Sequence, residues 1–268
     1  MDAGTDAKKD VPGLAPARCC SLVDVALTVG GRAFSIIAVR DQDALIENVK
    51  TDEDLAAFPY GLMLWASAIG LAERLAQQPE LVRGKRVLEI GAGVGLPGLV
   101  ARTLGAVHVT QTDYQETTLA LARSNAQRNG LAGEVEHRRA DWRDFPPDLL
   151  GAFDVVLGSD VLYERTLHAP LADLLPRLLR PGADGGLILV SDPLRPQALA
   201  FVEQQEQRAH LPGGWRVDVE GRRACLPGQI GPAAVQDIAL FFLRPRRPFF
   251  VQEGAKRPRS AGGVSPTV

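Results

Sequence analysis

The sequence predicts an α/β fold: a doubly wound sheet of seven strands, mostly parallel with one antiparallel strand, preceded by an N-terminal β-hairpin. An apolar run over residues 87–90 meets a turn with glycines at 91, 93 and 95, and a helical pattern follows. Apolar runs then alternate with helical patterns, which is typical of a parallel sheet with helices on both faces. Two extended runs near the end, 215–219 and 235–243, have no helix between them and predict the antiparallel pairing.

The composition is ordinary for a globular domain. Of the 268 residues, 46% are hydrophobic and 23% are charged, and the net charge of −2 gives no basic footprint for nucleic acid. No apolar run reaches transmembrane length, and the N-terminus lacks the apolar centre of a secretory signal. The cysteines, Cys19, Cys20 and Cys225, have neither disulfide nor metal spacing. We therefore expect a cytoplasmic, monomeric protein with no metal ion and no nucleic-acid or membrane partner.

The sequence divides into three segments. Residues 1–18 are small and polar, and residues 246–268 are basic and then contain glycine, serine and proline, so both are expected to be disordered tails. Between them, residues 19–245 are expected to form one domain, in which residues 19–80 supply the hairpin and the first helix. The basic residues between 244 and 259 are expected to be solvated, with contact to an anionic partner as the alternative.

The N-terminal elements precede the glycine turn. Two extended runs, 22–29 and 32–39, flank Gly30-Gly31, a two-residue hairpin signal. An acidic stretch over 41–54 is expected to be a surface loop or a short helix. Leu64, Ala68, Leu71, Ala72 and Leu75 form the apolar stripe of a helix that starts near Trp65. Trp65 is equally consistent with core packing and with a cofactor contact.

Beyond the turn, strands alternate with helices, and three strands end in an acid. The strands are expected at 107–112, 135–140 and 153–160, ending at Asp113, Asp141 and Asp160, with a helix at 116–129. A helix at 169–180, a strand at 186–191, a helix at 197–209 and the two closing strands follow, the last two joined by a loop over 221–232. Pro176 is expected to kink or break its helix, because proline lacks the N–H of the helical ladder.

The glycine motif admits two classes of cofactor. Gly93-x-Gly95-x-x-Gly98 matches the dinucleotide fingerprint, but the strand runs into Gly91. In register with the strand, the motif is Glu89-x-Gly91-x-Gly93-x-Gly95, which is typical of class I S-adenosylmethionine (SAM) methyltransferases. SAM has no pyrophosphate, and its methionine part needs a close approach of the backbone, which glycine allows. The sequence therefore favours a Rossmann-like SAM domain.

The carboxyl ends of parallel strands meet at one rim, where ligands bind at the switch point of the strand order. This rule brings together the glycine turn, Asp113, Asp141-Trp142 and Ser159-Asp160. Asp113 is expected to accept hydrogen bonds from ribose hydroxyls, and Asp141 to take the adenine amine. Trp142 either packs on the adenine ring or covers the edge of the sheet.

Five pieces of the chain together resemble the seven-β-strand protein-lysine methyltransferases, methyltransferase family 16. These are the segment starting at Trp65, the 87–98 glycine motif, Asp113-Tyr114, Asp141-Trp142 and 159–164 with Asp160-Val-Leu-Tyr163. The resemblance spans residues 20–245, and Pro176 and the long turn at 182–186 depart from it. It implies SAM as cofactor, a protein lysine as acceptor, and Asp160 and Tyr163 as catalytic residues. The implied cofactor-binding residues are Trp65, Glu89, Gly91, Gly93, Gly95, Asp113, Tyr114, Asp141, Trp142 and Ser159.

The expected chemistry is an in-line displacement that requires an aligned, neutral amine. Asp160 and Tyr163 are expected to hold the ammonium and then steer its lone pair; alternatively, Asp160 caps the next segment and Tyr163 packs on the sheet. Other functions stay open. A small-molecule N-methyltransferase would use the same chemistry. An NAD(P)-linked oxidoreductase would need a hydride site that the sequence lacks. A SAM-fold interaction module would have no catalytic activity.

Overall fold

The structure, a computed structural model, describes residues 22–39, 60–181, 186–208, 214–227 and 235–246. Its main sheet has seven strands in the order β5-β4-β3-β6-β7-β9-β8. The strands are β3 (Arg86–Ile90), β4 (His108–Asp113), β5 (Glu136–Arg139), β6 (Val155–Ser159), β7 (Leu187–Asp192), β8 (Trp215–Cys225) and β9 (Val235–Pro245). β9 is antiparallel to both neighbours and the other pairs are parallel, which confirms the predicted fold class. β3 and β6, neighbours across the switch point, start the two halves of the sheet.

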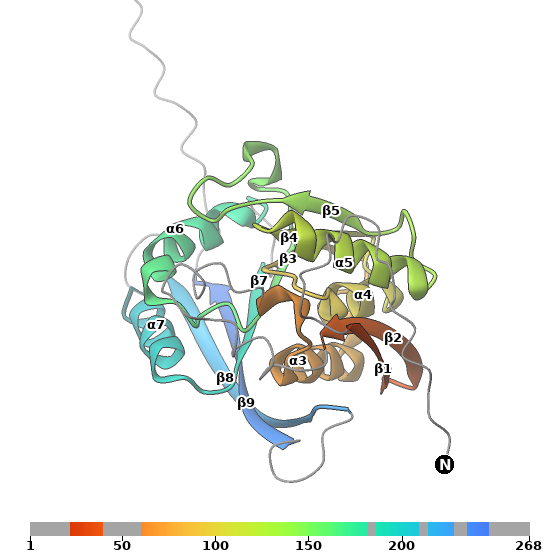
Figure 1. Cartoon of the computed structure of the whole chain (residues 1–268). Helices are drawn as coiled ribbons and strands as arrows, with labels where there is room; N and C mark the ends of the chain where they lie inside the picture. Colours follow the sequence, from red (N-terminus) through yellow and green to blue (C-terminus); the bar gives the residue numbers. More distant parts are fainter. Residues whose placement is uncertain (1–21, 40–59, 182–185, 209–213, 228–234, 247–268) are drawn as a thin grey trace, which may run out of the picture.

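Helices cover the two faces of this sheet (Figure 1). One face carries α3 (Ala66–Gln77), α4 (Leu96–Thr103), α5 (Glu116–Arg128) and the hairpin of β1 (Leu22–Val29) and β2 (Arg32–Val39); the other carries α6 (His168–Leu178) and α7 (Pro196–Gln207). Side chains of β3 alternate between the two cores, with Val87 in the first and Leu88 in the second. In the described part of the chain, no helix has the length and apolarity that a membrane crossing requires.

The N-terminal hairpin forms at the predicted residues. Val29 pairs with Arg32 across Gly30 and Gly31, whose φ angles are 58° and 80°. A two-residue turn with positive φ at both positions matches the twist of the strands, and glycine adopts it without strain. A Cβ on Gly30 would lie 2.7 Å from the Cβ of Ala76, so the hairpin tip sits directly against α3.

Two predictions about local structure are wrong. The loop expected from residue 221 does not begin there, because β8 continues through Gly221 to Cys225 and pairs with β9 down to Val235. Ala224 is buried against Gly70 of α3, so packing on the helix holds a segment that local propensity assigns to a loop.

Of the kink or break expected at Pro176, the break is wrong. α6 runs through Pro176 and ends at Leu178, because the buried stripe of Leu171, Leu174, Leu175 and Leu178 anchors it in the core.

Arg246, assigned to the basic tail, donates a hydrogen bond from its backbone N–H to the Gly214 carbonyl and therefore still belongs to the folded sheet edge. The acidic stretch at 41–54 and the expected tails at 1–18 and 247–268 lie outside the described residues.

Candidate functional site

The glycine turn joins the end of β3 to the start of α4. Gly91, Gly93 and Gly95 have φ angles of 55°, 56° and 84°, in the left-handed region that favours glycine. A Cβ on Gly91 would lie 3.0 Å from Val161 and 3.4 Å from the Trp142 ring. A Cβ on Gly93 would lie 3.2 Å from the carbonyl oxygen of Gly61. Gly91 and Gly93 are half-buried, and a side chain at either position would crowd these neighbours.

Glu89 lies behind this turn. Its Oε2 accepts hydrogen bonds from the Gly98 backbone at 3.0 Å and from Gln111 Nε2 at 2.7 Å, and Gln111 also donates to the Gly95 carbonyl at 2.6 Å. The side chain is fully buried, and burial raises the pKa of Glu89 to about 8. Glu89 therefore ties the turn to α4 and β4. It would affect a bound cofactor by holding the turn in position.

Asp113 ends β4 beside the glycine turn. Its Oδ2 accepts a hydrogen bond from the Gly93 backbone at 3.2 Å, and its Oδ1 accepts one from the Gln115 backbone at 3.1 Å. Burial raises the pKa of Asp113 to about 6, although these N–H groups oppose the shift. The next residue, Tyr114, is half exposed, and its hydroxyl accepts a hydrogen bond from Gln115. The structure thus joins Asp113 to the turn, as the strand-end rule predicted.

Asp141, Trp142 and Ser159 lie around the same rim with different surroundings. Arg143 engages both oxygens of Asp141, with Nε to Oδ1 at 2.9 Å and Nη2 to Oδ2 at 2.6 Å, and this lowers the pKa of Asp141. The Trp142 ring borders Gly91 and also packs on the core under α6, so both readings of Trp142 stay open. Ser159, half-buried, ends β6 next to Ser191 of β7.

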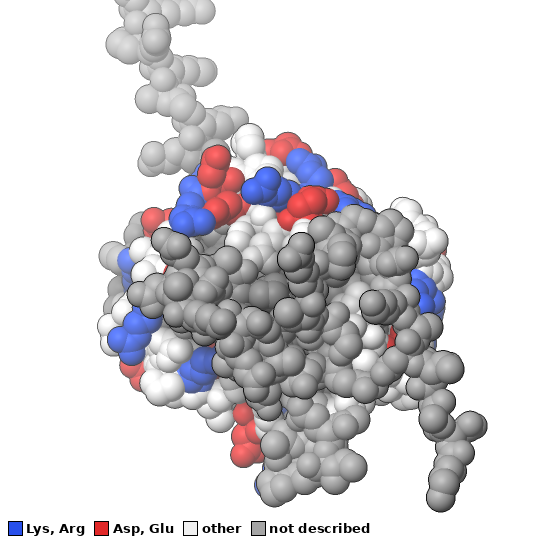
Figure 2. Space-filling model, in the orientation of Figure 1, with Lys and Arg blue, Asp and Glu red and all other residues white. Residues whose placement is uncertain are grey.

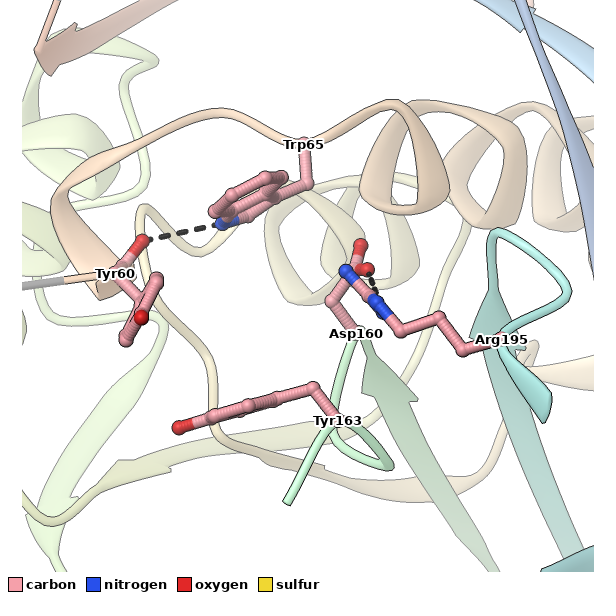
Figure 3. Close-up of a pocket in the computed structure, with 5 residues that line it drawn as sticks. All are labelled: Tyr60, Trp65, Asp160, Tyr163 and Arg195. Atoms are coloured by element: carbon pink, nitrogen blue, oxygen red, sulfur yellow. Dashed lines mark hydrogen bonds and ion pairs between the residues drawn. The ribbon is translucent and has the colours of Figure 1, made fainter. Parts of the chain in front are cut away.

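A cavity of about 230 Å³ opens beside the turn. Tyr60, Trp65, Asp160, Tyr163 and Arg195 line it (Figure 3). Tyr60 belongs to η1 (Tyr60–Leu62), and Trp65 precedes α3 and donates from Nε1 to the Tyr60 carbonyl at 3.1 Å. The rings of Tyr60 and Tyr163 are 5.5 Å apart and tilted by 46°. Three aromatic rings therefore form the walls, and a charged pair forms one end.

That charged pair is Asp160 and Arg195. Arg195 Nη1 lies 2.7 Å from Asp160 Oδ1 and 2.9 Å from Oδ2 of Asp192, which is fully buried. The second oxygen of Asp160, Oδ2, is buried and makes no hydrogen bond within the described residues. Burial raises the pKa of Asp160, while Arg195 and the nearby Ser67 hydroxyl oppose the shift. Burial also raises the pKa of Tyr163 to about 12, so its hydroxyl is protonated at neutral pH.

Reasoning from the sequence missed two of these lining residues. In the sequence, Tyr60 lies 100 positions before Asp160, and Arg195 lies more than 100 positions after Trp65. Neither residue belongs to the glycine motif. Arg195 had a usable signal: β7 ends at Ser191-Asp192, so the strand-end rule extended to this strand would have drawn attention to the loop that carries it.

Charged side chains of both signs lie along one edge of the molecule. Figure 2 shows acidic and basic residues intermixed along the upper edge of the molecule. Around β5, Arg138 pairs with Asp148 at 3.0 Å and Arg143 with Asp141 at 2.6 Å. The positive charge of each of these two arginines is therefore paired with the carboxylate of a neighbouring aspartate.

Solved structures share this fold at low sequence identity. Precorrin-6y C5,15-methyltransferase from Geobacter metallireducens superposes with a TM-score of 0.51 at 16% identity, over 66% of this chain and 87% of that one. The [4+2]-cyclase SpnF superposes with a TM-score of 0.50 at 18% identity, over 66% and 81%. A methyltransferase and a cyclase on one fold show that the fold alone does not decide the chemistry.

Curated relatives are similar over about half of this chain. The histone-arginine methyltransferase METTL23 of Xenopus laevis is 34% identical over 139 residues, 51% of this chain and 58% of the relative. The protein N-terminal and lysine N-methyltransferase EFM7 of Eremothecium gossypii is 37% identical over 159 residues, 52% and 58%. The protein N-lysine methyltransferase METTL21A of Danio rerio is 34% identical over 133 residues, 47% and 59%. The chain thus spans less than two thirds of the length of these relatives.

A family model described as lysine methyltransferase matches residues 41–207, a range that contains every residue lining the cavity. This match confirms the resemblance found in the sequence, and with it SAM, not a dinucleotide, as the cofactor. The chain belongs to the lysine methyltransferase family.

Proposed function

We propose that this protein transfers a methyl group from SAM to the side-chain nitrogen of a lysine in another protein. The observation that carries the proposal is the aromatic cavity beside the glycine turn, with the ion pair of Asp160 and Arg195 at one end. Family membership and relatives named as lysine methyltransferases support it. Cytoplasmic location and a monomeric state remain predictions, for cell fractionation and gel filtration to check.

The residues of the rim fit SAM. The left-handed turn at Gly91 and Gly93 presents half-buried backbone without side chains, which the methionine part could approach closely. Asp113, which accepts the Gly93 N–H, would accept hydrogen bonds from ribose hydroxyls. Trp142 borders the same turn and offers an apolar ring. When bound, SAM supplies a methyl group on a positively charged sulfur, which leaves with the bonding electron pair.

The cavity residues fit an amine on an apolar stem. The rings of Tyr60, Trp65 and Tyr163 would enclose the methylene groups and exclude water, and desolvation lowers the pKa of an amine toward its neutral, attacking form. The ammonium is attracted to the faces of the tyrosine rings and gives its proton to solvent as it enters the apolar cavity. Asp160 Oδ2 would accept one N–H and turn the lone pair of the nitrogen toward the cofactor.

Labelled SAM tests the proposal directly. Purified protein is incubated with labelled SAM and an undigested cell lysate, and mass spectrometry identifies the methylated residue type. We expect methyl-lysine, and we expect its loss in Asp160→Ala and in Gly93→Val, each shown to be folded. Label that appears only in small molecules would overturn the protein acceptor in favour of a small-molecule N-methyltransferase.

A further inference from the structure

The two oxygens of the Asp160 carboxylate have different surroundings. Oδ1 accepts a hydrogen bond from Arg195 Nη1 at 2.7 Å, whereas Oδ2 makes no hydrogen bond within the described residues, although the Ser67 hydroxyl lies near the carboxylate. Asp160 lines the cavity and is only 9% exposed, so water does not readily satisfy Oδ2. Arg195 thus holds one oxygen of the carboxylate at the edge of the cavity, and the other oxygen remains without a hydrogen bond in the described part of the chain.

Arg195 is itself fixed in place. Its backbone N–H donates to Asp192 Oδ1 at 2.7 Å and its Nη1 donates to Asp192 Oδ2 at 2.9 Å, so the buried Asp192 holds both ends of the residue. Figure 3 shows the guanidinium beside the Asp160 carboxylate, at the opposite end of the cavity from Tyr60. The same Nη1 therefore bridges the carboxylates of Asp160 and Asp192.

The backbone on both sides of this ion pair is unusual. Among the described residues, Asp160 and Leu194 are the non-glycine residues with positive φ, at 55° and 62°. They follow the adjacent strands β6 and β7, and the Asp160 N–H donates to the Ser191 carbonyl at 2.9 Å. Such conformations persist where the surroundings impose them, and they are frequent at binding sites. Here they bring Asp160 and Arg195 together.

We propose that Arg195 determines which nitrogen group the site accepts, an inference that rests on the proposed function. A guanidinium is bound best by two parallel hydrogen bonds to both oxygens of a carboxylate. Arg195 occupies one of these oxygens and places a positive charge beside the other. An amine needs a single acceptor oxygen, so the site selects amines over guanidines. The proposal bears on the relatives, whose names include arginine and lysine methyltransferases.

Two small cations with the same stem, n-butylamine and n-butylguanidine, test the selection without methyl transfer. Their binding to the full chain saturated with S-adenosylhomocysteine is measured by calorimetry and by the fluorescence of the cavity tryptophan. We expect the wild-type protein to bind the amine at least about tenfold more tightly than the guanidine. We expect Arg195→Gln to reduce this ratio below about threefold, with unchanged affinity for S-adenosylhomocysteine.

Two further variants separate selection from stability. Arg195→Lys keeps a cation at Asp160 Oδ1 and should keep the amine preference, which covers the case that Arg195→Gln does not fold. Arg74→Gln is the matched control: Arg74 pairs with Glu220 at 2.7 Å and is also largely buried, but it lies at the other end of α3 from Trp65. Arg74→Gln should change the thermal stability of the protein and leave the ratio of amine to guanidine affinity as in the wild type.

The outcomes separate this inference from the proposed function. Equal binding of both cations to the wild-type protein, or an unchanged ratio in folded Arg195→Gln, would overturn the role of Arg195 and leave lysine methylation standing. If neither cation binds while S-adenosylhomocysteine does, the cavity is not the acceptor site, and the role of Arg195 falls with it. Label found on lysine in the transfer experiment would still support the activity in that case.

Discussion

The side-chain amide of Asn125 donates a hydrogen bond to the carbonyl of Val94 at 3.0 Å and so ties helix α5 to the middle of the glycine turn. The same side chain accepts the Ile37 N–H at 2.7 Å and donates to the Ile37 carbonyl at 3.1 Å. One turn later, Asn129 makes the same pair of bonds to Ser35, at 3.0 and 2.9 Å. Four residues of helix rise about 6 Å, close to two residues of strand, so the two amides match the spacing of β2.

This pair of asparagines gives the first prediction. Asn125→Ala should weaken SAM binding by about tenfold or more, because the buried Val94 carbonyl loses its partner inside the cofactor turn. Asn129→Ala removes an equivalent clamp on the hairpin but touches nothing in the turn. Both variants should lower the free energy of unfolding by about 1–3 kcal/mol.

Calorimetry with SAM and chemical denaturation of both variants check this prediction. Equal losses of SAM affinity in the two variants would show that the hairpin as a whole, and not the contact with Val94, supports the cofactor site.

The second prediction concerns the pH dependence of cofactor binding. Ribose hydroxyls donate more strongly to an ionised carboxylate, and the pKa of Asp113 in the free protein is raised to about 6. SAM affinity should therefore rise as the pH increases through about 6. Asp113→Asn should weaken binding at pH 8 by about one to two decades, since a hydrogen bond to a charged group contributes about 1.5–3 kcal/mol. Titrations between pH 5 and 8 that superpose for both proteins would remove Asp113 from the ribose role.

The third prediction concerns stability and Glu89. The pKa of Glu89 is about 8 in the folded protein and near 4.5 when exposed, so the folded state binds the proton more tightly. Its contribution to stability is complete below pH 4.5 and is lost as the pH rises toward 8. Glu89→Gln cannot ionise, so its free energy of unfolding should fall less between pH 5 and 8 than that of the wild type. Urea denaturation at several pH values measures both curves, and parallel curves would contradict the shift.

The fold could be predicted because its signals are local. Gly30-Gly31 specifies the hairpin turn without reference to the rest of the chain, and its strands start and end as predicted. The second half of β8 could not be predicted, because Gly221 resembles a loop residue until Ala224 is seen packed against Gly70 of α3. Contacts of this kind join segments far apart in sequence and leave no local pattern.

The site was predictable where backbone position alone decides it. The strand-end rule predicted that Asp113 and Asp160 lie at the rim. It does not predict which way a side chain points or which neighbouring groups already hydrogen-bond to it. Arg143 on Asp141 is such a case, because the sequence does not show that both carboxylate oxygens are engaged. For Glu89, the direction of the side chain could be predicted from the sequence, because strand alternation places it on the same face as Val87, toward α4.

The last prediction concerns Tyr163, whose ring faces Tyr60 across the cavity at 5.5 Å. If the ring holds the acceptor, Tyr163→Ala should lower turnover at least about tenfold, which corresponds to about 1.4 kcal/mol of transition-state stabilisation. SAM affinity should stay within about threefold, because the ring acts on the acceptor side. Tyr163→Phe should keep most of the activity, since a hydroxyl with a pKa of about 12 is no base at neutral pH. Wild-type turnover in folded Tyr163→Ala would show that the ring only packs on the sheet. A loss as large in Tyr163→Phe as in Tyr163→Ala would instead assign the effect to the hydroxyl.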